Sequence, residues 1–359
     1  MTLPKPIKFK AERYVGGLSQ FKKIDNPIKL SANESALGSS PKAILAIEKD
    51  KDKIFKYPES DSNSLREVLS EKFNIDSKRI ICGSGSDQIF DLTCHLFLDP
   101  GDEVVVTEFG FIMHRIYAEL YKAKVILAKE KNFKASVDEI LGKVTDKTKI
   151  VFIANPNNPT GTYLSKNEMI NLRKKLRSNI LLVVDDAYFE FLNSENFSSG
   201  LDLFKDSGNV LITRTFSKIY GLAGLRLGWG YSSKEIIDAM YQIKPPFNVN
   251  RTALVAGAQA IKDNEWTNRA IEHNTLWSQK IFSALKEFNI KTNEPAANFF
   301  LMNFNETKIN SEEAFEKLAA KKLILRKMTQ YKISNTLRLT IGNKEVNEHF
   351  IKSLGSILK

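Results

Sequence analysis

One stretch decides how the rest of this chain is interpreted, and it reads Thr215-Phe216-Ser217-Lys218-Ile219-Tyr220-Gly221-Leu222-Ala223-Gly224-Leu225-Arg226-Leu227-Gly228-Trp229. It follows an apolar run at residues 210–213, which predicts a buried strand. Lys218 therefore comes just after a strand, with hydroxyls one and three residues before it and Arg226 eight residues after it. Hydroxyl and guanidinium groups bind phosphate, and glycines let a backbone approach a ligand closely. A lone lysine after a strand is usually a surface residue, but here the amine is placed to form an imine with an aldehyde.

Working outward, short apolar runs alternate with helical patterns on both sides of this stretch. This alternation predicts an α/β fold with a large domain built on a mostly parallel central sheet. The pattern changes after Pro245-Pro246, where a long helical stretch is followed by short strands that alternate with helices, as in a smaller α+β domain. We expect an N-terminal arm and the start of the small domain at 1–35, the large domain at 36–246 and the C-terminal small domain at 247–359. The expected strands are 79–82, 103–107, 149–154, 180–185, 210–213 and 228–231 in the large domain, and 299–304, 323–326 and 337–341 in the small one.

Composition narrows the class of protein. The 359 residues include 53 Lys and Arg against 42 Asp and Glu, a net charge of +11. This positive charge would suit anionic substrates, but the lysines are interleaved with acids, as at 48–53, which is typical of solvated faces. No nucleic-acid-binding motif is visible, so we expect no nucleic-acid partner.

Targeting and metal signals are absent from the sequence. No run approaches the roughly 18 apolar residues of a membrane span, and the first ten residues do not resemble a secretory signal. Cys82 and Cys94 lack neighbours at metal-ligand spacing, so we expect no metal and interpret both as reduced core residues. These features predict a cytoplasmic protein that does not associate with membranes.

Two further segments place polar groups directly after buried strands. Asp185 ends an apolar strand, where the ordinary interpretation is a turn or a helix cap. The functional interpretation is a carboxylate at the carboxyl edge of a parallel sheet, able to hold a pyridine nitrogen protonated, with Tyr188 close behind it. The run Asn155-Pro156-Asn157-Asn158-Pro159-Thr160-Gly161 is a turn by composition, but it is rigid enough to preorganise an amide donor.

A third segment, Gly83-Ser84-Gly85-Ser86-Asp87, opens a predicted helix. Free N–H groups and the helix dipole make such a turn a possible phosphate site. The motif is weak by itself, because similar loops often bind nothing. It is neither a dinucleotide fingerprint nor a Walker loop, since the required Gly-x-Gly-x-x-Gly and Gly-Lys-Ser/Thr patterns are missing.

Taken together, these segments resemble the fold-type I, pyridoxal-phosphate-dependent aminotransferases, and most specifically the histidinol-phosphate aminotransferase family. The resemblance extends from Tyr14 to about Phe350 and is most specific at 215–229 and then at 155–161. Further matching segments are Leu30-Ser31-Ala32-Asn33-Glu34, Tyr57-Pro58-Glu59, Pro246-Phe247-Asn248-Val249-Asn250, Asn298-Phe299-Phe300-Leu301 and Leu337-Arg338-Leu339-Thr340-Ile341-Gly342.

The resemblance implies pyridoxal 5'-phosphate as cofactor and assigns residues to it. Lys218 would bind the cofactor covalently and move the proton at the substrate Cα, while Asp185 would pair with the ring nitrogen. Tyr188 and Asn158 would hydrogen-bond the ring oxygen, and Phe109 would stack on the ring, where the family often has Tyr. The groups assigned to the cofactor phosphate and its surroundings are Gly85, Ser86, Asp87, Thr215, Ser217, Arg226 and Tyr57.

Because Tyr57 would reach the phosphate from another subunit, the resemblance also implies a homodimer. On the substrate side, Arg338 would take the α-carboxylate as a planar fork. Arg326 and Tyr14 would face a distal phosphate, and Asn33 and Asn158 would complete the substrate site.

The implied reaction interconverts L-histidinol phosphate and 2-oxoglutarate with imidazole-acetol phosphate and L-glutamate, in histidine biosynthesis. Three alternatives remain open: an aromatic-amino-acid aminotransferase, a phospho-amino-acid decarboxylase on the same fold, and a cofactor-binding transcription regulator. About thirty residues precede the enzyme-like region, too few for the added DNA-binding domain of such a regulator. The four histidines, His95, His114, His273 and His349, lie in helical patterns and are interpreted as non-catalytic.

Overall fold

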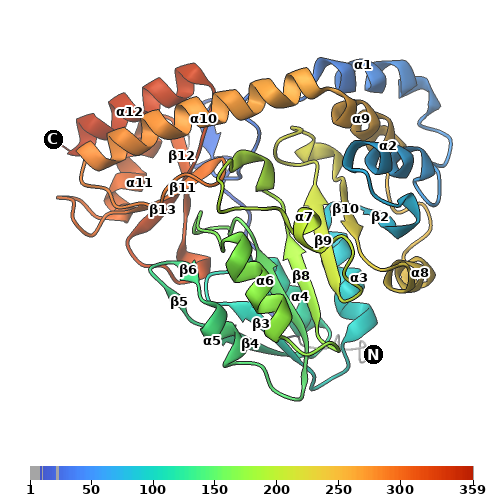
Figure 1. Cartoon of the computed structure of the whole chain (residues 1–359). Coiled ribbons are helices and arrows are strands. Elements are labelled where there is room, and N and C mark those ends of the chain that lie inside the picture. Colours follow the sequence, from blue (N-terminus) through green and yellow to red (C-terminus); the bar gives the residue numbers. More distant parts are fainter. Residues whose placement is uncertain (1–8, 10, 22–23, 359) are drawn as a thin grey trace, which may run out of the picture.

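A seven-stranded sheet forms the centre of the larger of two bodies (Figure 1). The computed structural model describes residues 9, 11–21 and 24–358. All strands of this sheet run parallel except β10, which is antiparallel to both of its neighbours. The strands, in spatial order, are β2 (Ile80–Gly83), β10 (Gly228–Tyr231), β9 (Val210–Thr215), β8 (Leu181–Asp185), β7 (Thr148–Ala154), β3 (Glu103–Thr107) and β4 (Lys124–Ala128). The predicted α/β class and mostly parallel sheet are confirmed.

The apolar runs become strands because both faces of the sheet are covered, so nearly every residue along a central strand is buried. In β7, Val151 and Ile153 face one core, while Ile150 and Phe152 face the other. Helices α3 (Ser86–Phe97), α4 (Ile112–Leu120) and α8 (Lys234–Ile243) cover the second face. The first face is covered by α1 (Pro41–Asp50), α2 (Asn63–Phe73), α5 (Val137–Leu141), α6 (Lys166–Lys175), α7 (Gly200–Phe204) and α9 (Arg251–Lys262).

The smaller body is a four-stranded mixed sheet with helices packed on it. Its spatial order is β1 (Ile28–Leu30), β12 (Leu323–Lys327), β13 (Thr336–Thr340) and β11 (Phe299–Asn303). Its helices are α11 (Ser311–Ala320), α12 (Lys344–Leu358) and the second half of α10 (Asn264–Glu287). A short hairpin of β5 (Glu130–Lys131) and β6 (Lys134–Ala135) lies apart from both sheets.

Helix α10 links the two bodies, running from the end near α1 and α9 to α12 at the other (Figure 1). The sequence expectation began the small domain at residue 247, but α9 packs against α1 and α2 and belongs to the core of the large sheet. Within α10, Ala270 still contacts that core, whereas Trp277 and Ile281 belong to the small one. We therefore propose that the change of domain lies within α10, because the proline pair follows the end of α8 while the next helix still packs on the core of the large sheet.

A separate apolar cluster joins α4 to the small body. Ile112 and Ile116 of α4 pack with Leu301 of β11 and with Met328 and Tyr331, which follow β12. The two bodies therefore share buried contacts beside the edge of the large sheet at which its parallel strands end.

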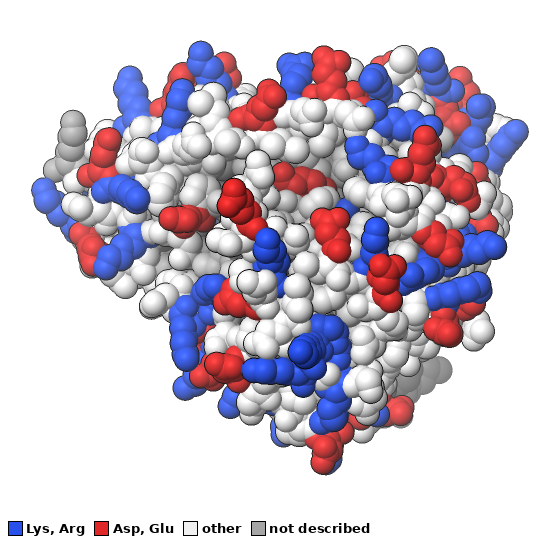
Figure 2. Space-filling view, in the orientation of Figure 1, with Lys and Arg blue, Asp and Glu red and all other residues white. Residues whose placement is uncertain are grey.

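Charge is distributed without a dominant sign on the face in Figure 2, where blue and red side chains alternate over both bodies. This agrees with lysines that serve as solvated surface groups. None of the helices within residues 9, 11–21 and 24–358 combines the length and the apolar character that crossing a bilayer requires.

Gly228 in β10 gives a test of how tightly the sheet packs on α3. A Cβ at this position would lie 2.3 Å from the Ser86 amide nitrogen and 2.6 Å from the Gly85 carbonyl carbon. Both are backbone atoms, so relieving the overlap would require the backbone itself to shift. Gly228→Ala should therefore lower the free energy of unfolding by about 1–3 kcal/mol. Gly224→Ala is the matched control, since no atom lies within 4 Å of its Cβ, and it should change stability by less than about 0.5 kcal/mol. Urea unfolding of both variants measures the difference; equal stability would contradict the packing.

Candidate active site

A pocket lies where the carboxyl edge of the large sheet meets the small body. Asp185 at the end of β8 is in register with Ala154 of β7 and Thr213 of β9, so the segments that follow these strands begin side by side. Most of the site residues predicted from the sequence line this one pocket. They are Tyr14, Asn33, Ser86, Asp87, Asn158, Asp185, Tyr188, Thr215, Ser217, Lys218, Arg226, Arg326 and Arg338.

Lys218 presents its amine inside the pocket. Its Nζ donates to the carbonyl oxygen of Ala32 at 3.4 Å and lies 5.6 Å from the centre of the Tyr188 ring. Burial lowers the pKa of Lys218 to about 8, and the positive charge of Arg338 acts in the same direction. An amine with this pKa is partly neutral near pH 7, as nucleophilic attack and proton transfer both require.

Asp185 is buried and held from two sides. Thr213 Oγ1 donates to its Oδ1 at 3.4 Å, and His114 Nε2 lies 3.5 Å from its Oδ2. The His114 ring stacks on Phe152 with centroids 4.7 Å apart. The interpretation of His114 as a non-catalytic residue of a helical pattern did not include its contact with Asp185. Helical periodicity carried no signal for it, because a histidine on an apolar helix face looks the same whether or not it faces a carboxylate.

The predicted phosphate turn adopts a geometry suited to an anion. Ser86 is the first residue of α3, so the amide groups at the start of this helix are directed towards the pocket edge. Gly85 has a φ of +80° and a ψ of 167°, a backbone conformation that strains any residue with a Cβ and therefore favours glycine. Arg226, itself at a φ of 53°, donates to Ser217 Oγ at 3.4 Å and to Asp87 Oδ2 at 3.1 Å. Burial raises the pKa of the Asp87 carboxyl group.

Arg326 and Arg338 are paired across the small sheet. They are opposite one another in the antiparallel register of β12 and β13, so both side chains leave the same face. Arg338 donates to Asn158 Oδ1 and, at 3.1 Å, to the Ser31 carbonyl oxygen, while Arg326 donates to the Val15 carbonyl oxygen. Both residues are less than 8% exposed. Within residues 9, 11–21 and 24–358, neither forms an ion pair with a carboxylate, so this end of the pocket attracts anions.

Asn33 ties the N-terminal segment to the pocket. Its Nδ2 donates to the Tyr188 hydroxyl at 2.9 Å, and its backbone amide donates to Thr340 Oγ1 at 3.0 Å. Burial raises the pKa of Tyr188 to about 12, so the hydroxyl keeps its proton at neutral pH. Tyr14 lies at the outer end, with its ring centre 5.8 Å from the Arg326 guanidinium carbon.

Three predicted residues do not line the pocket: Gly85, Tyr57 and Phe109. Gly85 shapes the turn through its backbone. The Phe109 prediction needs correction, because its amide donates to Glu130 Oε1 and its carbonyl accepts from Asn157 Nδ2, at 3.1 and 3.2 Å, and its ring lies against Phe133.

Phe111, two residues later, lines the pocket instead and immediately precedes α4. We propose Phe111 as the aromatic ring that faces the cofactor. The sequence Phe109-Gly110-Phe111 contains both aromatic residues, but the sequence alone does not show which of the two rings faces the pocket.

Tyr57 lies outside the pocket of its own chain. It is 79% exposed and stacks on Phe247 with ring centroids 4.5 Å apart. Within one subunit it cannot contribute to this pocket, so a role for it requires a second copy of the chain.

Comparisons with known proteins agree with this geometry. The family model for aminotransferase class I and II matches residues 25–354. A histidinol-phosphate aminotransferase of Pelagibacter ubique (strain HTCC1062) is 52% identical over 358 residues, covering 99% of both chains, and one of Maricaulis maris (strain MCS10) is 39% identical over 96% of both.

Solved structures show the same fold. A histidinol-phosphate aminotransferase from Sinorhizobium meliloti, solved in complex with pyridoxal-5'-phosphate, superposes with a TM-score of 0.85 at 21% identity, covering 92% of this chain and 90% of its own. A mutant aspartate aminotransferase from Thermus thermophilus gives 0.81 at 20% identity, covering 95% and 99%. The pocket, the fold and the sequence matches lead to the same conclusion, that this chain belongs to the aminotransferase class I and II family.

Proposed function

We propose that this chain uses pyridoxal 5'-phosphate to interconvert L-histidinol phosphate and 2-oxoglutarate with imidazole-acetol phosphate and L-glutamate. The observation that carries the proposal is the buried pair Arg326 and Arg338, which faces the same pocket as Lys218 and has no carboxylate partner among the described residues. The 52% identity over nearly the whole chain to a histidinol-phosphate aminotransferase supports the choice of substrate.

The pocket fits the cofactor at each of its functional groups. Lys218 offers an amine for the aldehyde, and the buried Asp185 carboxylate suits a protonated ring nitrogen. The phosphate would be held by Ser86, Thr215, Ser217 and Arg226 at the start of α3. When bound, the cofactor supplies an electron sink that makes the substrate Cα–H acidic.

Lys218 would then take the proton from the substrate Cα and return it at C4′ of the cofactor, the carbon on the other side of the amino nitrogen. Its pKa of about 8 suits both directions of transfer near neutral pH, since neither the charged nor the neutral amine is rare. Arg338 would hold the α-carboxylate of glutamate so that Cα–H faces Lys218, which favours proton loss over decarboxylation through orientation.

The two substrates place different demands on the arginine pair. Glutamate presents two carboxylates, whereas histidinol phosphate presents a phosphate and no carboxylate. Because Arg326 and Arg338 leave adjacent positions on one sheet face and both line the pocket, the pocket offers two guanidinium groups for anionic groups. We propose that Arg326, with Tyr14, receives the distal anion.

A homodimer is part of the proposal. Ile54, Phe55 and Tyr57 are all more than 70% exposed, an apolar cluster that a second subunit would cover. Tyr57 would then reach the phosphate end of the partner's pocket. A cytoplasmic location suits this metabolic role and is proposed with it.

The alternatives predict different responses. An aromatic-amino-acid aminotransferase would not need Arg326 for its substrates, and a phospho-amino-acid decarboxylase would release carbon dioxide without a keto acid. A transcription regulator would retard duplex DNA at moderate salt.

The main test is an absorbance spectrum of the purified protein with pyridoxal 5'-phosphate, recorded before and after adding L-histidinol phosphate. The visible band of the bound cofactor should bleach and return when 2-oxoglutarate is added. Lys218→Ala, as a control, should bind the cofactor without turnover. Bleaching by phenylalanine but not by histidinol phosphate would favour the aromatic enzyme. No band at all would refute the proposed function.

Arg326→Gln tests the assignment of the distal anion. Losing a charge-assisted hydrogen bond of about 1.5–3 kcal/mol should lower kcat/KM for histidinol phosphate about ten- to hundredfold. Activity with phenylalanine as amino donor should change little, because it carries no distal anion. Equal losses with both donors would argue against this role.

The ionisation of Lys218 can be followed in the apoprotein. Only the neutral amine reacts with trinitrobenzenesulfonate, so the modification rate of Lys218 should rise with pH and reach half its maximum near pH 8, the pKa that burial and Arg338 impose. Ordinary lysines titrate near pH 10.4. Peptide mass spectrometry over pH 6–11 measures the profile. Arg338→Met should move the midpoint upward, and a wild-type midpoint above pH 10 would contradict the buried amine.

A further inference from the structure

The segment Lys244 to Asn250 connects α8 to α9 and has no role in the chemistry described above. It includes residues 246–250, a segment that matches the family in sequence but to which the resemblance assigns no function. Its side chains contact three separate parts of the phosphate-binding apparatus, which are the turn before α3, the loop that carries Arg226 and the segment that carries Tyr57.

Asn248 contacts the turn before α3. Its Nδ2 donates to the carbonyl oxygen of Cys82 at 3.0 Å and to Gln88 Oε1 at 2.7 Å. The same Gln88 oxygen accepts the backbone N–H of Ser84 at 2.8 Å. One amide oxygen thus joins Asn248 to the backbone of the phosphate turn, so the position of the Ser84–Ser86 backbone depends on Asn248.

Asn250 contacts the loop that carries Arg226. Its Nδ2 donates to the Leu225 carbonyl oxygen at 2.9 Å, while its Oδ1 accepts the Ala253 N–H at 2.8 Å and so caps α9. The backbone next to Arg226 is therefore fixed to the first turn of a long, packed helix.

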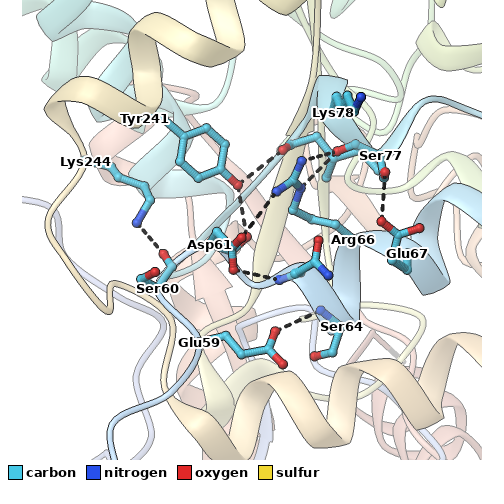
Figure 3. Close-up of polar contacts among 12 residues, drawn as sticks. Glu59, Ser60, Asp61, Ser64, Arg66, Glu67, Ser77, Lys78, Tyr241 and Lys244 are labelled. Atoms are coloured by element: carbon cyan, nitrogen blue, oxygen red, sulfur yellow. Dashed lines mark hydrogen bonds and ion pairs between the residues drawn. The ribbon is translucent and has the colours of Figure 1, made fainter.

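Ser60 and Asp61, which follow Tyr57 in the chain, are held by Lys244 and by Tyr241 of α8 (Figure 3). Lys244 Nζ donates to the Ser60 carbonyl oxygen at 2.6 Å and to Asn248 Oδ1 at 3.3 Å. The Tyr241 hydroxyl of α8 donates to the Asp61 carbonyl oxygen at 3.0 Å. Phe247 stacks on Tyr57 and has a φ of 52°, a left-handed conformation that is costly for a bulky residue and is kept only where the surroundings require it.

We propose that residues 244–250 form a positioning bracket for the phosphate site, in which Asn248 sets the turn of its own subunit and Phe247 sets Tyr57 for the partner's site. The proposal rests on the proposed function, because it takes the ligand of this turn to be the cofactor phosphate and the active form to be a dimer. The bracket touches no reacting atom and acts through the residues that it holds.

The first test compares pyridoxal 5'-phosphate with pyridoxal, which differ only in the phosphate. Asn248→Ala should raise the Kd of the phosphorylated cofactor for the apoprotein roughly tenfold, about the effect of one hydrogen bond to a charged group. The Kd of pyridoxal should stay the same.

Asn347→Ala is the matched control. Asn347 makes the same kinds of bond, donating to the Gly342 carbonyl oxygen at 2.7 Å and accepting the Gly342 N–H at 2.8 Å, but it lies in the small body away from the pocket. It should lower the thermal midpoint without changing either Kd. If Asn248→Ala weakens both ligands equally, or neither, the proposal is wrong. A wild-type protein that binds neither ligand would instead refute the proposed function.

A double-mutant cycle tests the path through Gln88. Gln88→Ala should weaken the phosphorylated cofactor to a similar degree, and adding Asn248→Ala should cause little further loss, since both changes break one connection. Fully additive losses would show that Asn248 acts by another route.

Mixed dimers test whether Asn248 acts on the site of its own subunit and Phe247 acts on the site of the partner subunit. With Lys218→Ala in one chain only, the single working site takes Lys218 and its phosphate turn from the intact chain and Tyr57 from the other. Asn248→Ala should raise the half-saturating cofactor concentration only when placed in the chain that keeps Lys218. Phe247→Ala should do so only in the opposite chain. If either substitution had the same effect in both chains of the mixed dimer, the proposed bracket would be wrong.

Discussion

The register of three neighbouring parallel strands is the constraint on which the site depends. Asp185 is aligned with Ala154 on one side and with Thr213 on the other. Neighbouring strands lie about 4.8 Å apart, so the segments that leave them start within a side chain's reach of each other. The amide of Asn155 and the amide of Asp186 continue the hydrogen bonding one step beyond the strands, at 3.0 and 2.9 Å. The buried apolar side chains that fix this register, far from any ligand, therefore determine where the carboxylate, the asparagine loop and the lysine meet.

The parts of the site that the sequence predicted are those whose chemistry follows directly from a strand end. Asp185 comes immediately after an apolar run, and Lys218 follows three residues after the end of β9, so the sheet places both near its carboxyl edge. The α/β class and the central strands were predictable for the same reason, because buried parallel strands leave a continuous apolar signal.

The parts that escaped prediction depend on contacts between distant segments. The pairing of Arg326 with Arg338 is a matter of strand register in the small sheet, to which neither local sequence contributes a signal. Phe111 rather than Phe109 lines the pocket, and the Phe109 backbone is instead hydrogen-bonded to Glu130 and to Asn157, a residue 48 positions away. The contact between His114 and Asp185 also joins distant segments, since His114 lies in α4 and Asp185 ends β8. The proposed shift of the domain limit from Pro245-Pro246 into α10 also rests on such contacts, because the sequence of α9 does not show that it packs on α1 and α2.

The start of α4 holds both Phe111, which lines the pocket just before the helix, and His114, which contacts the Asp185 carboxylate, and their two rings meet edge to face at 5.6 Å. The next residues of the same helix, Ile112 and Ile116, are packed with Leu301, Met328 and Tyr331 of the small body. A rotation of the small body would thus move α4. The same movement would alter the position of Phe111, the ring proposed to face the cofactor, and the surroundings of Asp185, the proposed partner of the ring nitrogen. Arg326 and Arg338 lie on β12 and β13 of that same body, so a substrate anion held there, as proposed, would be connected through α4 to the aromatic ring and the carboxylate of the proposed cofactor site.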